Sequence, residues 1–263
     1  MSRIKRSRSL IVALIAMVAL AVFPTAAGAT HSWGGYHWAR TSNPFTLKLG
    51  DNVSGLWDGM LVTASSDWSA SNVLDTTIVA GGTRPKTCRA TTGRVEVCSA
   101  RYGNTGWLGV AQIWITGSVH IVQGTVKNND TYFGSSSYAY NNTAEMQHVI
   151  CQEVGHTFGL AHQDESGISL NTCMDYYHNT SASDTISTHP NQHDYDELGT
   201  IYAHLDSTTT VGSLPASFLS GDFSSPSAWG RLVSSSRDGR ESTYLRDFGH
   251  GNILVTHVIW AAE

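Results

Sequence analysis

Short stretches of alternating apolar and polar residues recur in the first half of the chain, and each predicts a β-strand. The clearest covers residues 45–49, where Phe, Leu and Leu alternate with Thr and Lys before a Gly-Asp-Asn turn. Later stretches are rich in β-branched and aromatic residues, although their alternation is less regular. These stretches predict strands at 76–80, 94–98, 107–116 and 119–126.

Apolar residues at helical spacing predict three main helices. Between residues 54 and 71, large apolar residues and an alanine recur at spacings of four, three and four, which gives one apolar face. Thr143 is predicted to cap a second helix whose apolar residues extend to Phe158. Residues 194–205 predict the third helix. Strands and helices together indicate an α+β fold.

Residues 1–29 have the features of a secretory signal peptide. Four basic residues precede an apolar run from Leu10 to Phe23, which is short for a membrane span. Ala27-Gly28-Ala29 fits an A-x-A cleavage site, so the mature chain is predicted to begin at Thr30 and to be secreted. An uncleaved membrane anchor is the alternative.

The rest of the chain divides into a main domain and a small C-terminal segment. Residues 30–205 carry the predicted helices and most of the strands, and residues 206–228 are rich in Ser, Thr, Gly and Pro, which predicts a linker. Residues 229–263 contain three short β-rich stretches separated by Gly and Asp turns. This segment is too small for a core of its own, so it is predicted to dock on the main domain or to form a small β-rich appendage.

Charge excludes one class of partner. Removing residues 1–29 removes four basic and no acidic residues, which changes the formal net charge from −5 to −9. Such an acidic chain is unsuited to nucleic acid and suits a soluble exported protein. No membrane partner is expected after cleavage of the signal peptide.

The candidate chemistry lies in the sequence QEVGHTFGLAH, from Gln152 to His162. Gln152 and His156 are four residues apart, so a helix would place both side chains on one face. Gly159 can end that helix with a sharp turn that returns His162 to the same point. Three protein ligands and an open fourth position are typical of a catalytic zinc site, with Glu153 beside it as a general base.

This segment resembles the HExxHxxGxxH motif of the metzincin zinc metalloproteases, with Gln152 in place of the first histidine. Residues 172–176 (TCMDY) fit the methionine turn of that family, with Met174 as its methionine and Tyr176 two residues later. The resemblance implies a zincin-like mixed β-sheet with an active-site helix, a methionine turn and a C-terminal helix.

The resemblance also implies a function, namely a secreted zinc-dependent endopeptidase acting on a protein or peptide substrate. One catalytic Zn²⁺ would be bound by Gln152, His156 and His162, Glu153 would activate a zinc-bound water, and Tyr176 would stabilise the oxyanion. An edge strand from the 107–127 region would pair with the extended substrate.

Other interpretations of these residues stay open. A glutamine amide binds zinc less strongly than imidazole, so the alternative is an inactive metzincin-fold protein that binds an extended peptide or a surface polymer. A hydrolase of another class, such as an amidase of cell-wall peptides, is a third option. Asp164 is predicted either to orient His162 or to be an exposed turn residue. His148 is expected to be an ordinary polar helix residue.

The polar stretch from Lys127 to Tyr140 is predicted to be a loop. Asn128, Asn129 and Asp130 could supply oxygen ligands to a structural Ca²⁺, but calcium needs more ligands than these three offer, so a solvated loop is favoured.

Four cysteines in an exported chain predict two disulfides, and three pairings are possible. We favour Cys88–Cys98, which closes a short loop around a predicted Thr-Thr-Gly turn, and Cys151–Cys173, which would join the active-site helix to the methionine turn. Closing the second loop would stabilise the fold by about 3 kcal/mol in the chain-entropy description. The chain lacks CxxC pairs, which argues against a cysteine zinc site.

Overall fold

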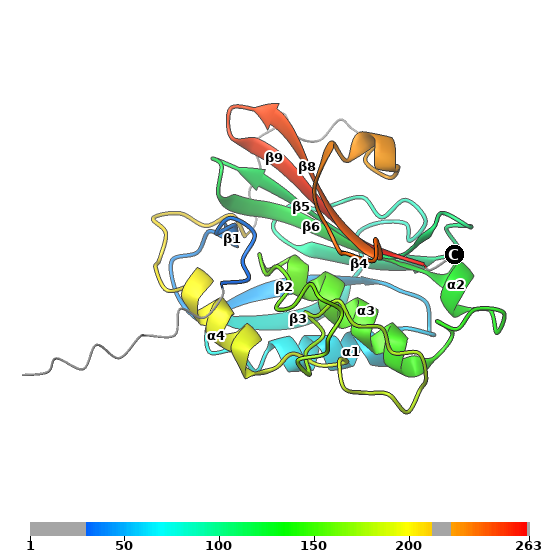
Figure 1. Cartoon of the computed structure of the whole chain (residues 1–263). Coiled ribbons are helices and arrows are strands. Elements are labelled where there is room, and N and C mark those ends of the chain that lie inside the picture. Colours follow the sequence, from blue (N-terminus) through cyan, green and yellow to red (C-terminus); the bar gives the residue numbers. More distant parts are fainter. Residues whose placement is uncertain (1–29, 212–221, 262–263) are drawn as a thin grey trace, which may run out of the picture.

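A computed structural model describes residues 30–211 and 222–261 (Figure 1). The predicted signal peptide therefore lies outside the described residues, as does part of the predicted linker. No helix in the described part of the chain combines the length and the apolar character that crossing a membrane requires.

The described strands form one mixed sheet in the order β3-β2-β4-β6-β5-β9-β8-β7, and β1 pairs separately with β6. The first half of the sheet is parallel except for β5, which runs antiparallel to β6. Each strand predicted in this region is confirmed, with small differences in its ends. These strands are β2 (Phe45–Asn52), β3 (Leu74–Ala80), β4 (Val95–Ala100), β5 (Trp107–Thr116) and β6 (His120–Asn129). The two-residue strand β1 (His37–Trp38) was not predicted.

The three predicted helices are present, and a short fourth helix lies between β6 and the second of them. The helices are α1 (Asp58–Trp68), α2 (Asp130–Phe133), α3 (Thr143–His156) and α4 (Gln192–Ile201). Helix α3 packs on β5 and β6 and against α1, so its residues face both the sheet and the core (Figure 1).

The N-terminal caps of these helices differ from the prediction. Asn142, not Thr143, caps α3, and its side chain accepts a hydrogen bond from the backbone of Glu145. Asparagine satisfies the free N–H groups of a first turn as well as threonine does, and here it has the extended backbone that a cap requires. Helix α4 begins with a capping box formed by Asn191 and Asp194.

The predicted loop after β6 is only partly a loop. Strand β6 continues to Asn129, and both Asn128 and Asn129 are buried. The Asn129 side chain accepts a hydrogen bond from the backbone of Thr131, and Asp130 accepts one from the indole of Trp57. The solvated-loop interpretation of these residues is therefore wrong, because their polar groups are used inside the protein.

The C-terminal segment extends the main sheet. Its strands are β7 (Arg231–Ser235), β8 (Glu241–Gly249) and β9 (Asn252–Trp260), preceded by a turn of 3-10 helix at Pro226–Ala228. Strand β9 runs antiparallel to β5, and β8 and then β7 continue the sheet beyond it; β8 and β9 are labelled in the upper part of Figure 1. Docking is therefore achieved by sheet pairing and by the buried side chain of Trp229, which packs with Trp107 and Val258.

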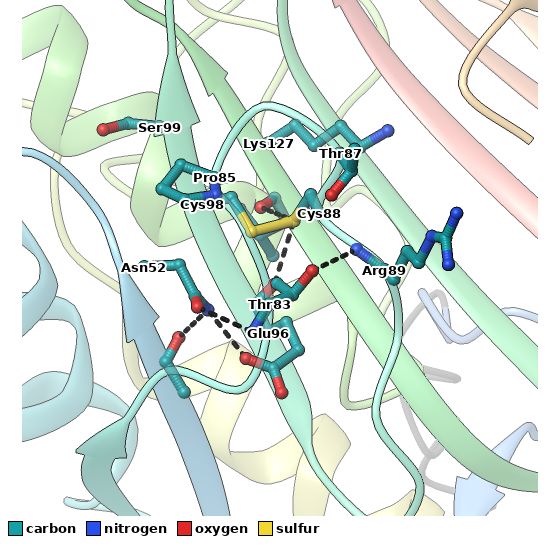
Figure 2. Close-up of a disulfide and its surroundings, with 12 residues drawn as sticks. Asn52, Thr83, Pro85, Thr87, Cys88, Arg89, Glu96, Cys98, Ser99 and Lys127 are labelled. Atoms are coloured by element: carbon teal, nitrogen blue, oxygen red, sulfur yellow. Dashed lines mark hydrogen bonds between the residues drawn. A yellow bond between two sulfur atoms is a disulfide. The ribbon is translucent and has the colours of Figure 1, made fainter.

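Both predicted disulfides are confirmed, Cys88–Cys98 and Cys151–Cys173. Figure 2 shows the first, which lies beside the buried carboxylate of Glu96. Glu96 accepts hydrogen bonds from Asn52 and from the backbone of Gly82, at 2.7 and 3.1 Å. The two disulfides indicate an extracellular or otherwise oxidising environment.

Candidate metal centre

Helix α3 and the turn after it bring His156 and His162 together. His156 is the last residue of α3, and Gly159 has φ +96°, the left-handed conformation expected of a glycine that ends a helix. A side chain at Gly159 would lie 2.0 Å from the carbonyl oxygen of Tyr36, so only glycine fits this turn. The two histidine rings lie 4.6 Å apart.

A third histidine, His257, reaches the same point from β9. Alternate residues of β9 face opposite sides of the sheet, and Val255 and Ile259 pack into the core with α3. His257 lies between them on that face, with ring centroids 4.1 Å from His156 and 4.7 Å from His162. One ligand atom from each of the three buried histidines lies within 4.8 Å of the others. This triad could hold a metal ion.

The partners of the Nδ1 atoms show which nitrogen each ring offers. Nδ1 of His156 lies 2.8 Å from the carbonyl of Leu160, and Nδ1 of His257 lies 3.2 Å from a carboxylate oxygen of Glu153. Because both partners accept hydrogen bonds, Nδ1 carries the proton and Nε2 keeps its lone pair. Metal-binding histidines are held in this way by carbonyl or carboxylate partners. Nε2 of His156 has no hydrogen-bond partner in the described chain.

Glu241 of β8 adds a carboxylate to the triad. Its Oε2 lies 3.0 Å from Nε2 of His162 and 3.2 Å from Nε2 of His257. Two ligand atoms bound at about 2.0–2.1 Å to a tetrahedral zinc are about 3.3–3.4 Å apart, so these spacings suit a shared ion. A carboxylate oxygen that faces a nitrogen lone pair repels it unless a cation or a proton lies between them. The residues present therefore fit a metal ion.

Burial determines the charge state of these groups. Burial lowers the pKa values of His156 and His162 well below the usual range, and it lowers the pKa of His257 to about 3. The imidazoles therefore stay neutral, which is the form that binds a metal. Burial also raises the pKa of Glu241 well above its usual range, and the charge of Glu153 adds to this effect. A bound cation would compensate the ionised carboxylate.

Gln152 is buried on the same helix, one residue before Glu153. Its amide nitrogen donates a hydrogen bond to the carbonyl of Asp175 at 2.9 Å, and its Oε1 has no hydrogen-bond partner within the described chain. The idea that Gln152 binds the metal stays a prediction. The third ligand predicted from the sequence was Gln152, and the structure places the imidazole of His257 beside the other two histidines.

Glu153 and Tyr176 both lie at the centre, as the motif predicts, although their catalytic roles stay predictions. Glu153 is buried, and burial raises its pKa well above the usual range while a hydrogen bond from the backbone of Ala111 opposes the shift. The ring of Tyr176 lies 4.2 Å from that of His162. Burial raises the pKa of Tyr176, so its hydroxyl keeps its proton.

Met174 packs against helix α3 at Gly155. A side chain added at Gly155 would lie 2.7 Å from the sulfur of Met174 and 2.6 Å from the ring of Trp68. The helix therefore passes so close to Met174 and Trp68 that only glycine fits at position 155. The Cys151–Cys173 disulfide fixes the same contact covalently.

The structure decides between the two alternatives for Asp164, in favour of the turn residue, and it corrects the expectation for His148. Asp164 does not orient His162; its carboxylate accepts hydrogen bonds from Ser166 within its own turn, and Glu165 is the acid nearest His162, at 3.9 Å. His148 is not an ordinary polar residue, because it is fully buried and its Nδ1 lies 2.6 Å from the carbonyl of Ser187.

The strand expected to pair with substrate has no free edge. Strand β5 pairs with β6 on one side and with β9 on the other, from Trp107 opposite Trp260 to Ile115 opposite Ile253. The centre is accordingly closed, since His156, His257, Glu153 and Glu241 are all fully buried.

Sequence reasoning missed His257, Glu241 and also Trp33, whose ring stacks on His156 at 4.5 Å. The available signal for His257 was a single ionisable residue inside the apolar stretch ILVTHVIW. That signal is weak, because a histidine in such a strand is usually a hydrogen-bonded core residue.

Comparison with the profiles of known protein families, with curated proteins and with solved structures gave no match to this chain. Its function therefore has to be argued from the geometry of the centre.

Proposed function

We propose that the chain is an exported, zinc-dependent endopeptidase of metzincin type whose metal is held by His156, His162 and His257. The observation that supports this most directly is the convergence of three neutral imidazoles, two of them with Nδ1 held by an acceptor, beside the buried carboxyl of Glu153. The turn at Gly159 and the methionine below the helix support the same family.

Each residue has a distinct part in this proposal. Zinc supplies Lewis acidity at the scissile carbonyl. Glu153, with its raised pKa, accepts a proton from the attacking water and returns it to the leaving amine. Glu153 also holds His257 in the tautomer that presents Nε2. The hydroxyl of Tyr176 stays protonated, so it can donate a hydrogen bond to the oxyanion.

A peptide can reach this centre only if the covering strands move. Glu241 lies where a fourth ligand would bind, and β9 pairs along the strand that the family would leave for substrate. We therefore propose that the described arrangement is the closed form of the enzyme, in which Glu241 holds the fourth position.

A second candidate function rests on the same glutamate. Three histidines and Glu241 make four protein ligands, and a closed set of four is typical of a structural zinc site. In that case the protein is not an enzyme, and the metal joins α3 to the C-terminal strands. Binding of an extended peptide or a surface polymer without catalysis belongs to this candidate.

The test is peptide hydrolysis by the secreted chain loaded with zinc, with and without a chelator. Glu241→Ala removes the fourth ligand and should raise the rate of hydrolysis relative to the wild type. Glu153→Gln should abolish hydrolysis in both backgrounds, whereas Glu145→Gln is a matched control. Glu145 is a buried glutamate on the same helix, about 12 Å from Glu153 at 1.5 Å per residue.

The outcomes separate the two candidates. Chelator-sensitive hydrolysis that depends on Glu153 and not on Glu145 supports the endopeptidase. Absence of hydrolysis from both the wild type and the zinc-loaded Glu241→Ala chain would contradict it. If that chain still binds zinc and His156→Ala abolishes the binding, the result supports the second candidate, a structural zinc site.

A further inference from the structure

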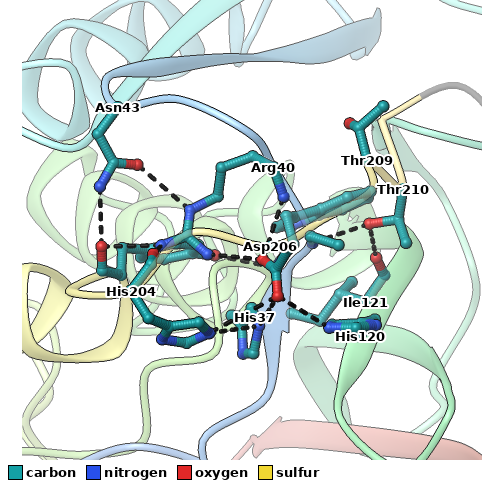
Figure 3. Close-up of polar contacts among 12 residues, drawn as sticks. His37, Arg40, Asn43, His120, Ile121, His204, Asp206, Thr209 and Thr210 are labelled. Atoms are coloured by element: carbon teal, nitrogen blue, oxygen red, sulfur yellow. Dashed lines mark hydrogen bonds and ion pairs between the residues drawn. The ribbon is translucent and has the colours of Figure 1, made fainter.

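A second cluster of histidines lies outside the candidate metal centre (Figure 3). It contains His37 of β1, His120 at the start of β6, and His204 and Asp206, which follow α4. Sequence reasoning attached no chemistry to any of these four residues. Three chain segments meet here, and the pairs that join them are 86 to 169 residues apart in sequence.

Ligand atoms of His37, His204 and Asp206 all lie within 4.8 Å of one another, and His120 joins this group through Asp206. Oδ1 of Asp206 lies 3.2 Å from Nε2 of His120, 3.5 Å from Nε2 of His37 and 3.7 Å from Nε2 of His204. Nε2 of His37 and Nε2 of His204 lie 3.1 Å apart. The edges of a tetrahedral zinc site with bonds of about 2.0–2.1 Å are about 3.3–3.4 Å long. These four spacings, from 3.1 to 3.7 Å, bracket that length.

The surrounding groups hold these atoms in place. Nδ1 of His37 lies 2.8 Å from the carbonyl of Gly35, which fixes the proton on Nδ1 and leaves Nε2 free. Arg40 engages the other oxygen of Asp206, through its guanidinium at 2.9 Å and its backbone N–H at 3.2 Å. Asp206 is thereby oriented with Oδ1 directed at the histidines.

The rings are arranged around a point and are not stacked. The His37 ring makes an interplanar angle of 82° with His120 and of 88° with His204. Figure 3 shows the three rings directed at the carboxylate of Asp206 from different elements. Ligands around a tetrahedral ion approach from such different directions, so these angles are compatible with a shared ion.

We propose that His37, His120, His204 and Asp206 bind a second zinc ion, in a structural site. Three imidazole nitrogens and one carboxylate oxygen suit zinc, and four protein ligands leave no position for substrate. The ion would tie β1 and the segment after α4 to the start of β6. The same segment is already joined there by Thr210, whose hydroxyl donates to the carbonyl of Ile121 and accepts from the backbone of Ala39.

A metal-free arrangement is the alternative that the test must separate. Without zinc, His204 can donate to His37, and His120 can donate to Asp206, within hydrogen-bond distance in both cases. The 3.7 Å spacing between His204 and Asp206 is too long for a hydrogen bond and has no role in that arrangement. Each of the four side chains has a partner in both arrangements, so the number of bound zinc ions has to decide between them.

The test counts zinc in the secreted chain after dialysis against metal-free buffer, followed by titration with zinc alone. The wild type should bind two zinc ions per chain. His120→Asn with His204→Asn should bind one, as should His156→Ala, and the three changes together should bind none. His204 and His120 are 53% and 29% exposed, so asparagine at these positions should not disturb the core. His189→Asn, a change at an exposed histidine outside both clusters, should still bind two.

Cobalt(II) gives an independent measurement, because its visible absorption is much stronger in a tetrahedral site. The His120→Asn, His204→Asn chain should lose one of the cobalt complexes that the wild type forms, while thermal unfolding shows that it is folded. The proposal is overturned if that folded chain binds as much zinc as the wild type, or if the wild type at saturation binds a single ion that only His156→Ala removes. Either result is independent of peptide hydrolysis, so it can be distinguished from failure of the proposed function.

Discussion

The two histidine clusters use similar ligands in contrasting surroundings. His156, His162 and His257 are buried beside two further acids, Glu153 and Glu241. His37, His120 and His204 share a single acid, Asp206, which is neutralised by Arg40, and His204 is half exposed. Glu153 is an additional carboxyl beside neutral histidines, so it can accept and return a proton. Asp206 is paired with Arg40, which keeps it ionised, so it cannot. The candidate ligands are alike, but only the buried cluster has the additional acid that the proposed hydrolysis would use.

The largest expected effect concerns the acid that only the buried cluster has. Glu153→Ala should lower the kcat/KM for peptide hydrolysis by about 10²–10⁴-fold, the range usual for loss of a general acid–base group. The measurement is hydrolysis by the zinc-loaded Glu241→Ala chain with and without this change. His120→Asn provides the comparison and should leave kcat/KM unchanged. Equal losses in both variants would show that the clusters do not differ in chemistry.

The next effect concerns which residue is the third ligand of the buried cluster. His257→Ala should weaken zinc binding there by more than about 100-fold, because even an outer partner of a ligand contributes about 10–100-fold. Gln152→Ala should change zinc affinity much less, since the Gln152 amide nitrogen is bonded to Asp175. Competition with a chromophoric chelator measures both, in chains that also carry His204→Asn. The reverse order of effects would restore Gln152 as the ligand and assign His257 to the core.

A smaller effect should follow when zinc is removed from the half-exposed cluster. At free zinc about 100 times the dissociation constant, a bound ion stabilises the folded chain by about 2.7 kcal/mol. A mild chelator should therefore lower the Tm of the wild type. The same chelator should leave the Tm of the His120→Asn, His204→Asn chain unchanged, because that chain has no zinc in the half-exposed cluster to lose. The buried zinc should be lost more slowly, because all of its ligands are buried.

The smallest effect concerns the pH dependence of stability that the carboxyl of Asp175 contributes. Burial raises the pKa of Asp175 from 3.8 to about 7, so the folded chain holds a proton there that the unfolded chain has released. Stability should consequently fall as the pH rises from about 4 to about 7. Asp175→Asn keeps an acceptor for the backbone of Leu170 and should flatten this part of the curve of Tm against pH, measured in chelator. An unchanged curve would contradict the pKa shift of Asp175.

Local features of the chain were predictable, and long-range features were not. The strand at 45–52 and the helix α1 follow from apolar spacing within a few residues, and both are confirmed. The same holds for the turn at Gly159, whose positive φ is a property of one residue. The Cys151–Cys173 pairing was also accessible, because the resemblance placed both cysteines beside the same centre.

His257 and Glu241 could not be found in this way, because their positions depend on pairing between β5, β9 and β8. A β-strand reveals which residues share a face, but it does not reveal its neighbour in the sheet. The stretch from Ile253 to Trp260 is apolar on both faces, so the pattern alone could not place His257 on the side of α3. His37 and Asp206 escaped for a similar reason, since they meet across 169 residues.

Strand β9 imposes an order of events during biosynthesis. Glu153 and His257 are 104 residues apart in sequence, so the ribosome must add all of the intervening chain before the triad can form. A nascent polypeptide that has emerged only as far as α4 holds two of the three histidines and has no Glu241 to cover them. His257 and Glu241 are therefore both added in one late stage of translation, so the complete triad forms together with the strands that cover it. A producing cell would not contain an uncovered triad at any earlier stage.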